Sequence, residues 1–125
     1  MIKTKSTNTD FHCDLTNDRL QLNSDAPIFK GGLGNGFRPH ELLEGALASC
    51  ISITIRMIAK QKNIKLDTVE TQVEIEKTEN KTVFNYSIKL DGDLNQTDKD
   101  FLINIIDLCA VKQTLTKQLE FKQNG

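Results

Sequence analysis

The order of the elements predicts an α+β fold, in which strands and helices occupy separate runs of the chain. Two strand pairs are indicated by residues 11–24 and 69–90, where apolar and polar side chains alternate. Two helices are indicated by residues 39–62 and 101–110, where apolar side chains recur at helical spacing. A chain of 125 residues supports one core, so we expect a single domain over residues 1–125.

The first strand pair is a predicted hairpin near the N-terminus. Its apolar face includes Cys13, to which we assign a structural role, and a Thr-Asn-Asp turn signal stands at residues 16–18. The following segment, residues 25–38, is rich in glycine, which predicts a mobile connection. Its glycines lack the spacing of a phosphate-binding loop, so phosphate binding has little support.

The helix over residues 39–62 is the strongest local prediction. Pro39 suits the first turn of a helix, and no charged residue occurs from Gly45 to Ile55. Apolar and small side chains cover the whole circumference there, which indicates a helix buried on most sides. We therefore expect a homodimer with this helix near the interface. The alternative is that one sheet and the second helix cover it within a single chain.

The second strand pair and second helix follow. Apolar residues alternate with an acidic, solvated row over residues 69–76, Asn80-Lys81 makes the turn, and the alternation resumes over residues 83–90. Asn95 or Thr97 is the expected cap of the second helix, whose apolar spacing directs Cys109 toward the core. A last strand is expected around Leu119–Phe121.

Composition narrows the possible partners and locations. The 16 basic and 17 acidic side chains nearly cancel, so we expect no binding to nucleic acid or to an anionic membrane. No apolar run at the N-terminus resembles a secretory signal and none reaches membrane-spanning length, which favours the cytoplasm. In that compartment the three cysteines are expected to be free, catalytic or metal-binding, and the absence of a Cys-x-x-Cys pair argues against a metal site.

Two cysteine motifs resemble those of a known family. The segment Pro39-His-Glu-Leu-Leu-Glu-Gly-Ala-Leu-Ala-Ser-Cys50 is similar to the first cysteine helix of the OsmC/Ohr family, the osmotically inducible and organic hydroperoxide resistance proteins. Cys109-Ala-Val-Lys-Gln-Thr-Leu looks like the second motif of that family. The resemblance implies an intertwined homodimer with two long central helices and sheets wrapped around them. It also implies thiol-dependent reduction of organic hydroperoxides without metal or other cofactor, and an external dithiol reductant such as a lipoylated protein.

The resemblance assigns roles residue by residue. Cys50 would attack the peroxide and Cys109 would resolve the sulfenic acid as a disulfide, a cycle that protects the first thiol from overoxidation. Family peroxidases pair the attacking cysteine with an arginine from the N-terminal strands and a glutamate ten residues before it. Here His40 stands at that spacing, Glu41 follows it, and Arg38 is the best remaining candidate for the cation.

The second motif also differs from the family pattern. Ala110 and Lys112 stand where members usually carry proline and histidine. Lys112 could bring a positive charge near the thiols or could be a solvated lysine at a helix C-terminus. One alternative to a peroxidase is that the two cysteines are inert core thiols. Another is a noncatalytic protein that binds a small hydrophobic ligand in an apolar pocket at the dimer interface, with the cysteines as lining residues. A third is a reactive-thiol sensor or sulfur carrier.

Overall fold

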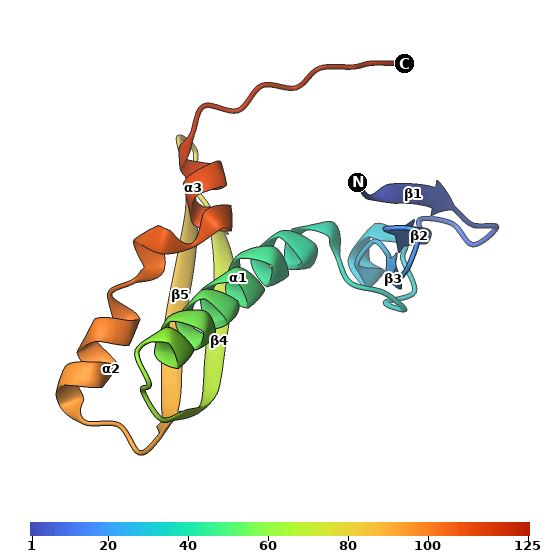
Figure 1. The fold of residues 1–125 in the computed structure, drawn as a ribbon. Coiled ribbons are helices and arrows are strands. Elements are labelled where there is room, and N and C mark those ends of the chain that lie inside the picture. Colours follow the sequence, from blue (N-terminus) through green and yellow to red (C-terminus); the bar gives the residue numbers. More distant parts are fainter. The chain divides into compact units, whose positions relative to one another are not determined.

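The computed structural model describes residues 1–125, which divide into two compact units, 1–43 and 44–125. Its antiparallel sheets and separate helices confirm the predicted α+β class. The first unit holds a three-stranded sheet and the second a hairpin with the helices (Figure 1). The elements are β1 (Lys3–Ser6), β2 (Cys13–Thr16), β3 (Gln21–Ser24), η1 (Ile28–Lys30), α1 (Pro39–Gln61), β4 (Leu66–Lys77), β5 (Thr82–Gly92), α2 (Gln96–Ile103), η2 (Ile106–Leu108) and α3 (Ala110–Thr116).

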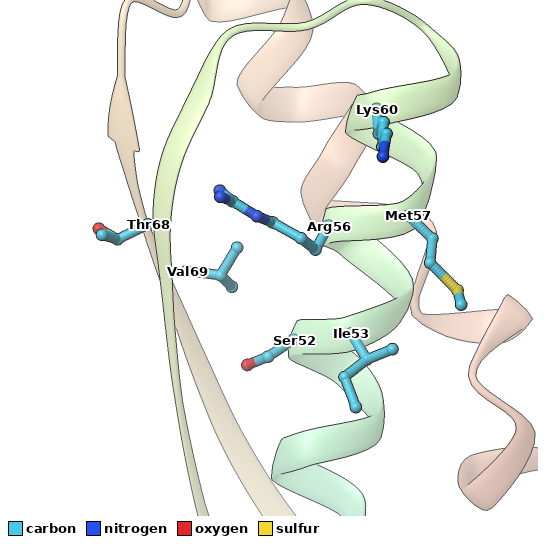
Figure 2. A pocket seen from close by; sticks show the side chains of 7 residues that line it. All are labelled: Ser52, Ile53, Arg56, Met57, Lys60, Thr68 and Val69. Atoms are coloured by element: carbon cyan, nitrogen blue, oxygen red, sulfur yellow. The ribbon is translucent and has the colours of Figure 1, made fainter.

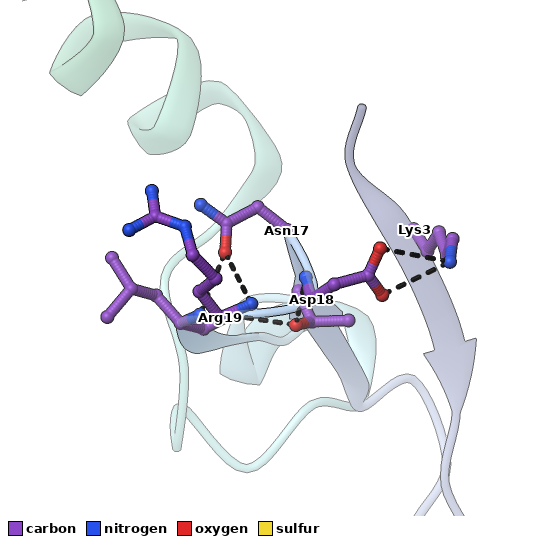
Figure 3. Close-up of polar contacts among 6 residues, drawn as sticks. Lys3, Asn17, Asp18 and Arg19 are labelled. Carbon is purple, nitrogen blue, oxygen red and sulfur yellow. Dashed lines mark hydrogen bonds and ion pairs between the residues drawn. The ribbon is translucent and has the colours of Figure 1, made fainter.

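The sheet of the first unit has the order β1-β2-β3, so the hairpin predicted for residues 11–24 is confirmed. In the turn, the Asn17 side-chain oxygen accepts the N–H groups of Arg19 and Leu20 at 3.0 and 2.8 Å (Figure 3). Asp18 takes a positive φ of 74°, a conformation that Asp tolerates better than most residues. Its carboxylate pairs with Lys3 on β1 at 3.1 Å, an exposed contact of small energy.

The glycine-rich segment is an ordered loop, so our prediction of a mobile connection is wrong. Residues 25–37 fold around the buried carboxylate of Asp25, and their far end returns to β3, where the Phe37 N–H donates to the Asn23 carbonyl at 3.0 Å. Glycine composition does not distinguish a flexible linker from a loop whose backbone must pass close to itself. Here the N–H groups bound by the Asp25 carboxylate hold the loop in one conformation.

Helix α1 begins and ends within one residue of the predicted range. Glu41 accepts the Arg38 N–H at 2.8 Å, which satisfies one of the free donors at the helix start. The buried side of α1 is a stripe with four-residue spacing, which continues into a core shared with the hairpin and the C-terminal helices. That core consists of Leu47, Ile51, Ile55, Ala59, Leu102, Ile105 and Cys109.

Our expectation that no segment reaches membrane-spanning length is wrong, because the 23 residues of α1 are long and apolar enough to cross a membrane. A core helix passes the same test of length and composition. Ile51 and Ile55 of α1 are each only 1% exposed and pack with apolar residues of β4 and β5. One stripe of α1 therefore packs in the core, and only 22% of its apolar window is buried in the single chain.

The β4–β5 hairpin confirms the second predicted strand pair and its solvated acidic row. Polar side chains of α1 bind β4 along one side of this hairpin. The Glu44 carboxylate accepts the Ile75 N–H at 2.7 Å, and Arg56 donates to the carbonyls of Leu66 and Asp67, each at 2.7 Å. These bonds fix the rotation of α1 over the hairpin, so the opposite side of the helix stays exposed.

The second helix was predicted to start after a cap at Asn95 or Thr97 and to continue through Cys109 to residue 110; its start is confirmed, but its continuation past residue 103 is wrong. Asn95 caps α2 as expected, its side chain accepting the Asp98 N–H at 2.8 Å. The helix then stops at Asn104, whose side chain donates to the Asp100 carbonyl at 2.8 Å. Two further short pieces, η2 and α3, continue the same apolar spacing, so periodicity alone did not reveal the breaks.

The expected last strand is also absent. No residue after Thr116 lies in a strand or helix, and Phe121 is 91% exposed. A strand needs a neighbour for its backbone hydrogen bonds, and within this chain no strand pairs with residues 119–121. The apolar pattern of this segment is therefore not used within the chain.

Candidate functional site

The two cysteines of the second unit meet in space. Cys50 lies midway along α1, and Cys109 lies at the junction between η2 and α3. Cys109 is fully buried and belongs to the core, while Cys50 is half-buried and packs against that core. Each thiol shifts the pKa of the other, so the two side chains interact, and both thiols are free. Residues 59 positions apart in the sequence therefore form one dithiol site.

The break before α3 supplies the polar part of this site. Cys109 has an extended backbone (φ −67°, ψ 119°), so α3 begins directly after it and its first N–H groups have no helical partner. The N–H groups of Val111 and Ala110 favour the Cys50 thiolate and lower the pKa of Cys50, as does the hydroxyl of Thr54, one turn along α1. A continuous helix through Cys109 would have used these N–H groups internally, so the dithiol site depends on the break.

The surroundings of the two thiols shift their pKa values in opposite directions. Burial raises the pKa of Cys50, but hydrogen bonds from Cys109, Val111, Thr54 and Ala110 outweigh burial and leave this pKa below its ordinary value. Burial and the hydrogen bond to Cys50 raise the pKa of Cys109 above its ordinary value. The half-buried cysteine therefore ionises first, with the other thiol as its donor.

The other predicted site residues lie in the first unit. Arg38 and Glu41 contact each other, with 3.2 Å between the guanidinium Nε and the carboxylate Oε1. The Arg38 N–H and guanidinium hold the pKa of the Glu41 carboxyl below its ordinary value. His40 is exposed and borders a small hollow with Pro39 and Leu43. Of the five candidates, the structure thus brings together Cys50 with Cys109 and Arg38 with Glu41.

Lys112 is not at a helix C-terminus, as one of our two interpretations required. It lies in the first turn of α3, where its backbone N–H acts to lower the pKa of Cys109 against the larger opposing effects of burial and Cys50. Its side chain forms an ion pair with Asp107, which raises the pKa of Lys112. The lysine therefore does stand beside the thiol pair, although its charge is shared with a carboxylate. Cys13 lies on β2 of the first unit.

The side of α1 around Cys50 is less enclosed than we expected. Leu47 is buried, but Ile53 and Met57 are 55% and 60% exposed. They border a hollow of about 480 Å³ between α1 and β4, in which Arg56 reaches toward β4 and Met57 points away from it (Figure 2). No cysteine lines this hollow. Its lining consists of Ser52, Ile53, Arg56, Met57, Lys60, Thr68 and Val69.

Sequence reasoning missed three groups that matter for the site. Thr54 was given no role, although its hydroxyl lowers the pKa of the Cys50 thiol. The backbone N–H groups of residues 110 and 111 were missed because the helix break carries no strong signal, apart from the turn-forming Asn104 and Asp107 before it. The structure contains no cluster of three or more His, Cys, Asp or Glu side chains that could hold a metal ion.

The sequence profile of the OsmC-like protein family matches residues 32–124, a range that includes both cysteines of the site. The chain belongs to the OsmC-like family. The match confirms the resemblance drawn from the two cysteine motifs. A comparison with curated proteins gave no match.

Solved structures of OsmC-like proteins share the fold across most of this chain. An OsmC-like protein from Mycoplasma pneumoniae is 20% identical, with a TM-score of 0.78 over 92% of this chain and 85% of that one. An organic hydroperoxide resistance protein OsmC from Legionella pneumophila is 22% identical, with a TM-score of 0.68 over 93% and 88%. The organic hydroperoxide resistance protein OhrB of Bacillus subtilis is 20% identical, with a TM-score of 0.64 over 93% and 89%.

Proposed function

We propose that this OsmC-like protein reduces organic hydroperoxides, with Cys50 as the attacking thiol and Cys109 as the resolving thiol. The observation that supports this most directly is the unequal thiol pair, in which hydrogen bonds lower the pKa of Cys50 while burial raises that of Cys109. A peroxide is attacked by a thiolate, and the sulfenic acid that results is protected by a nearby protonated thiol. Two inert core thiols would not require such donors.

The proposed cycle is balanced with one hydroperoxide and one external dithiol. The Cys50 thiolate attacks the terminal oxygen of ROOH and the O–O bond breaks, giving a Cys50 sulfenic acid and an alkoxide, which takes a proton to form the alcohol. The Cys109 thiol then displaces hydroxide as water, and a Cys50–Cys109 disulfide forms. An external dithiol, for which a lipoylated protein is our candidate, reduces it by thiol exchange and leaves as its own disulfide.

We assign the remaining site residues supporting roles. The Arg38–Glu41 pair would supply the cation and carboxylate that orient the hydroperoxide, and His40 would act as a hydrogen-bond partner. Arg38 and Glu41 already contact each other, as such a pair requires. The N–H groups of Ala110 and Val111 also stabilise the Cys50 thiolate, since the family arginine has no counterpart in the N-terminal strands.

We further propose that the protein acts as a homodimer in the cytoplasm. Ala46, Cys50, Ile53 and Met57 follow each other on α1 at spacings of four, three and four, the pattern of a helix–helix seam. Ile53 and Met57 are more than half exposed in the single chain. A second copy packed along this seam would remove them from water and place Cys50 near the interface. Light scattering after size-exclusion chromatography tests the dimer, and a monomer would rule it out.

The activity is tested by mass spectrometry of the reduced protein after stoichiometric cumene hydroperoxide. We expect a Cys50–Cys109 disulfide within seconds, Cys50 sulfenic acid in Cys109→Ser, and no oxidation in Cys50→Ser. Cys13→Ser is the matched control and should behave as the wild-type protein, because Cys13 lies on β2, outside the unit that holds the dithiol. Thiols that stay reduced would refute the peroxidase.

The hollow between α1 and β4 favours one second candidate, the binding of a small apolar ligand. Its apolar lining comes from Ile53, Met57, Val69 and the stems of Arg56 and Lys60, and no cysteine reaches it. A fluorescent fatty acid that binds wild type and Cys50→Ser equally, and Val69→Asp weakly, would support this function. It would also show that the ligand site and the dithiol are separate.

A further inference from the structure

Asp25 is the only buried charged side chain of the chain, and the proposed chemistry does not use it. It follows β3 directly and is only 2% exposed. Its Oδ2 atom accepts the N–H groups of Leu33 and Asn35 at 3.0 and 3.3 Å, whereas Oδ1 has no partner. A carboxylate removed from water costs free energy unless hydrogen bonds replace the lost hydration. The two bonds that it makes both close the loop of residues 25–37.

The glycines of this loop allow the close approach that Asp25 requires. A Cβ atom on Gly32 would lie 1.8 Å from the Ala26 carbonyl oxygen and 2.9 Å from Asp25 Oδ1. A Cβ atom on Gly36 would lie 2.8 Å from the Asn23 carbonyl oxygen. At both glycines a side chain would clash with the backbone, so only glycine allows the loop to pass this close to Asp25 and β3. The carboxylate is thus covered by its own loop rather than by a deep core.

The same loop leads directly into the Arg38–Glu41 pair. The Asp25 N–H donates to the Phe37 carbonyl at 3.0 Å, so the two ends of the loop are tied together. Arg38 is the next residue, and its N–H donates to Glu41 at the start of α1. The carboxylate of Asp25 therefore holds residues 33 and 35 of the loop, backbone bonds hold Phe37 at its end, and Arg38 follows Phe37 in the chain. If the loop opened, the backbone before Arg38 would lose its fixed position.

We propose that Asp25 is a positioning residue for the Arg38–Glu41 pair. Its carboxylate closes residues 25–37 into one fixed loop and thereby fixes where the Arg38 guanidinium stands. The inference rests on the proposed function in one respect, because the pair is taken to orient the hydroperoxide. The closure of the loop can be tested without any activity.

Limited trypsin digestion tests the closure, since Lys30 is an exposed cleavage site inside the loop. In Asp25→Asn, which keeps the side-chain size, we expect cleavage after Lys30 to rise by about tenfold or more, because cleavage follows the population of the open loop. Cleavage after Lys62, in the second unit, is the internal reference and should not change. Asp18→Asn, the same change at an exposed position of the first unit, is the matched control.

The positioning role is tested by a double-mutant cycle on the rate of Cys50 oxidation by cumene hydroperoxide. We expect Asp25→Asn to slow oxidation as much as Arg38→Ala does, and the double variant to be no slower than either, because both remove the same group from its place. Alkylation of Cys50 by iodoacetamide should stay at the wild-type rate in all three, since Thr54 and the residue 109–111 segment hold the thiolate. A generally unfolded variant would change alkylation as well.

Unchanged cleavage after Lys30 in Asp25→Asn would overturn the loop closure. Oxidation that is slower in the double variant than in Arg38→Ala alone would show that Asp25 acts other than through Arg38, and would overturn the positioning role. A wild-type protein whose Cys50 resists the hydroperoxide would refute the proposed function and the role of Asp25 in it. The cleavage result would still decide the closure in that case.

Discussion

Replacing Thr54 by valine removes one donor from the Cys50 sulfur and keeps the shape of the side chain. A hydrogen bond to a partly solvated, ionised acceptor contributes about 1 kcal/mol, because solvent screening brings it below the range of about 1.5–3 kcal/mol for charged groups. Its loss should lower the thiolate fraction of Cys50 about fivefold at a pH below the thiol pKa. The remaining thiolate is more basic and more nucleophilic, so the alkylation rate should fall only about two- to threefold.

Two measurements separate these quantities. Thiolate absorbance in the ultraviolet gives the ionised fraction, and mass spectrometry after timed iodoacetamide treatment gives the rate at Cys50. Thr71→Val is the matched control, because it removes the 2.8 Å hydroxyl contact between Thr71 and Ser52 and leaves the thiol untouched. Equal effects of the two substitutions, or no effect of Thr54→Val, would show that the hydroxyl does not hold the thiolate.

Three further outcomes follow from the same structure. The pH dependence of alkylation should inflect at a lower pH for Cys50, and at a higher pH for Cys109, than it does in the chain unfolded by guanidinium chloride. Because folding lowers the pKa of Cys50, the free energy of unfolding should rise with pH toward the ordinary thiol range. Because folding raises the pKa of Cys109, the free energy of unfolding should fall above that range. Leu102→Ala should lower the free energy of unfolding in urea by about 2–5 kcal/mol because Leu102 is fully buried, whereas Leu119→Ala at an exposed position should change it by less than about 0.5 kcal/mol. Asn95→Ala should cost about 1 kcal/mol in the same assay through loss of the α2 cap, and an unchanged midpoint would contradict that role.

Local sequence patterns were sufficient to predict the elements whose hydrogen bonds lie within one hairpin or one helix. The hairpin of residues 11–24, the β4–β5 pair, the long helix α1 and the Asn95 cap could all be read from alternation, helical spacing and capping residues. The two cysteine motifs were enough to identify the family, because paired motifs at that separation are specific. Each of these patterns, and each of the two motifs taken singly, lies within a short stretch of sequence.

Other features depend on contacts that no local pattern encodes. The glycine-rich loop is ordered because Asp25 accepts two N–H groups eight and ten residues away. The second helix is broken because Asn104 caps it, although the apolar spacing continues through η2 and α3. Residues 119–121 have a strand-like pattern but no neighbouring strand in this chain.

The sequence by itself determined the fold class and the family, and it singled out Cys50 and Cys109 as candidate site residues, since these follow from periodicity and from motif residues. The resemblance implied that Cys50 and Cys109 meet, but only the tertiary structure gave the groups that lower the pKa of Cys50 and raise that of Cys109. The physical reason is that a thiol pKa depends on the donors and the burial around the sulfur. Here the donors come from Thr54, one turn along α1, and from backbone N–H groups nearly sixty residues later, which a helix break leaves free.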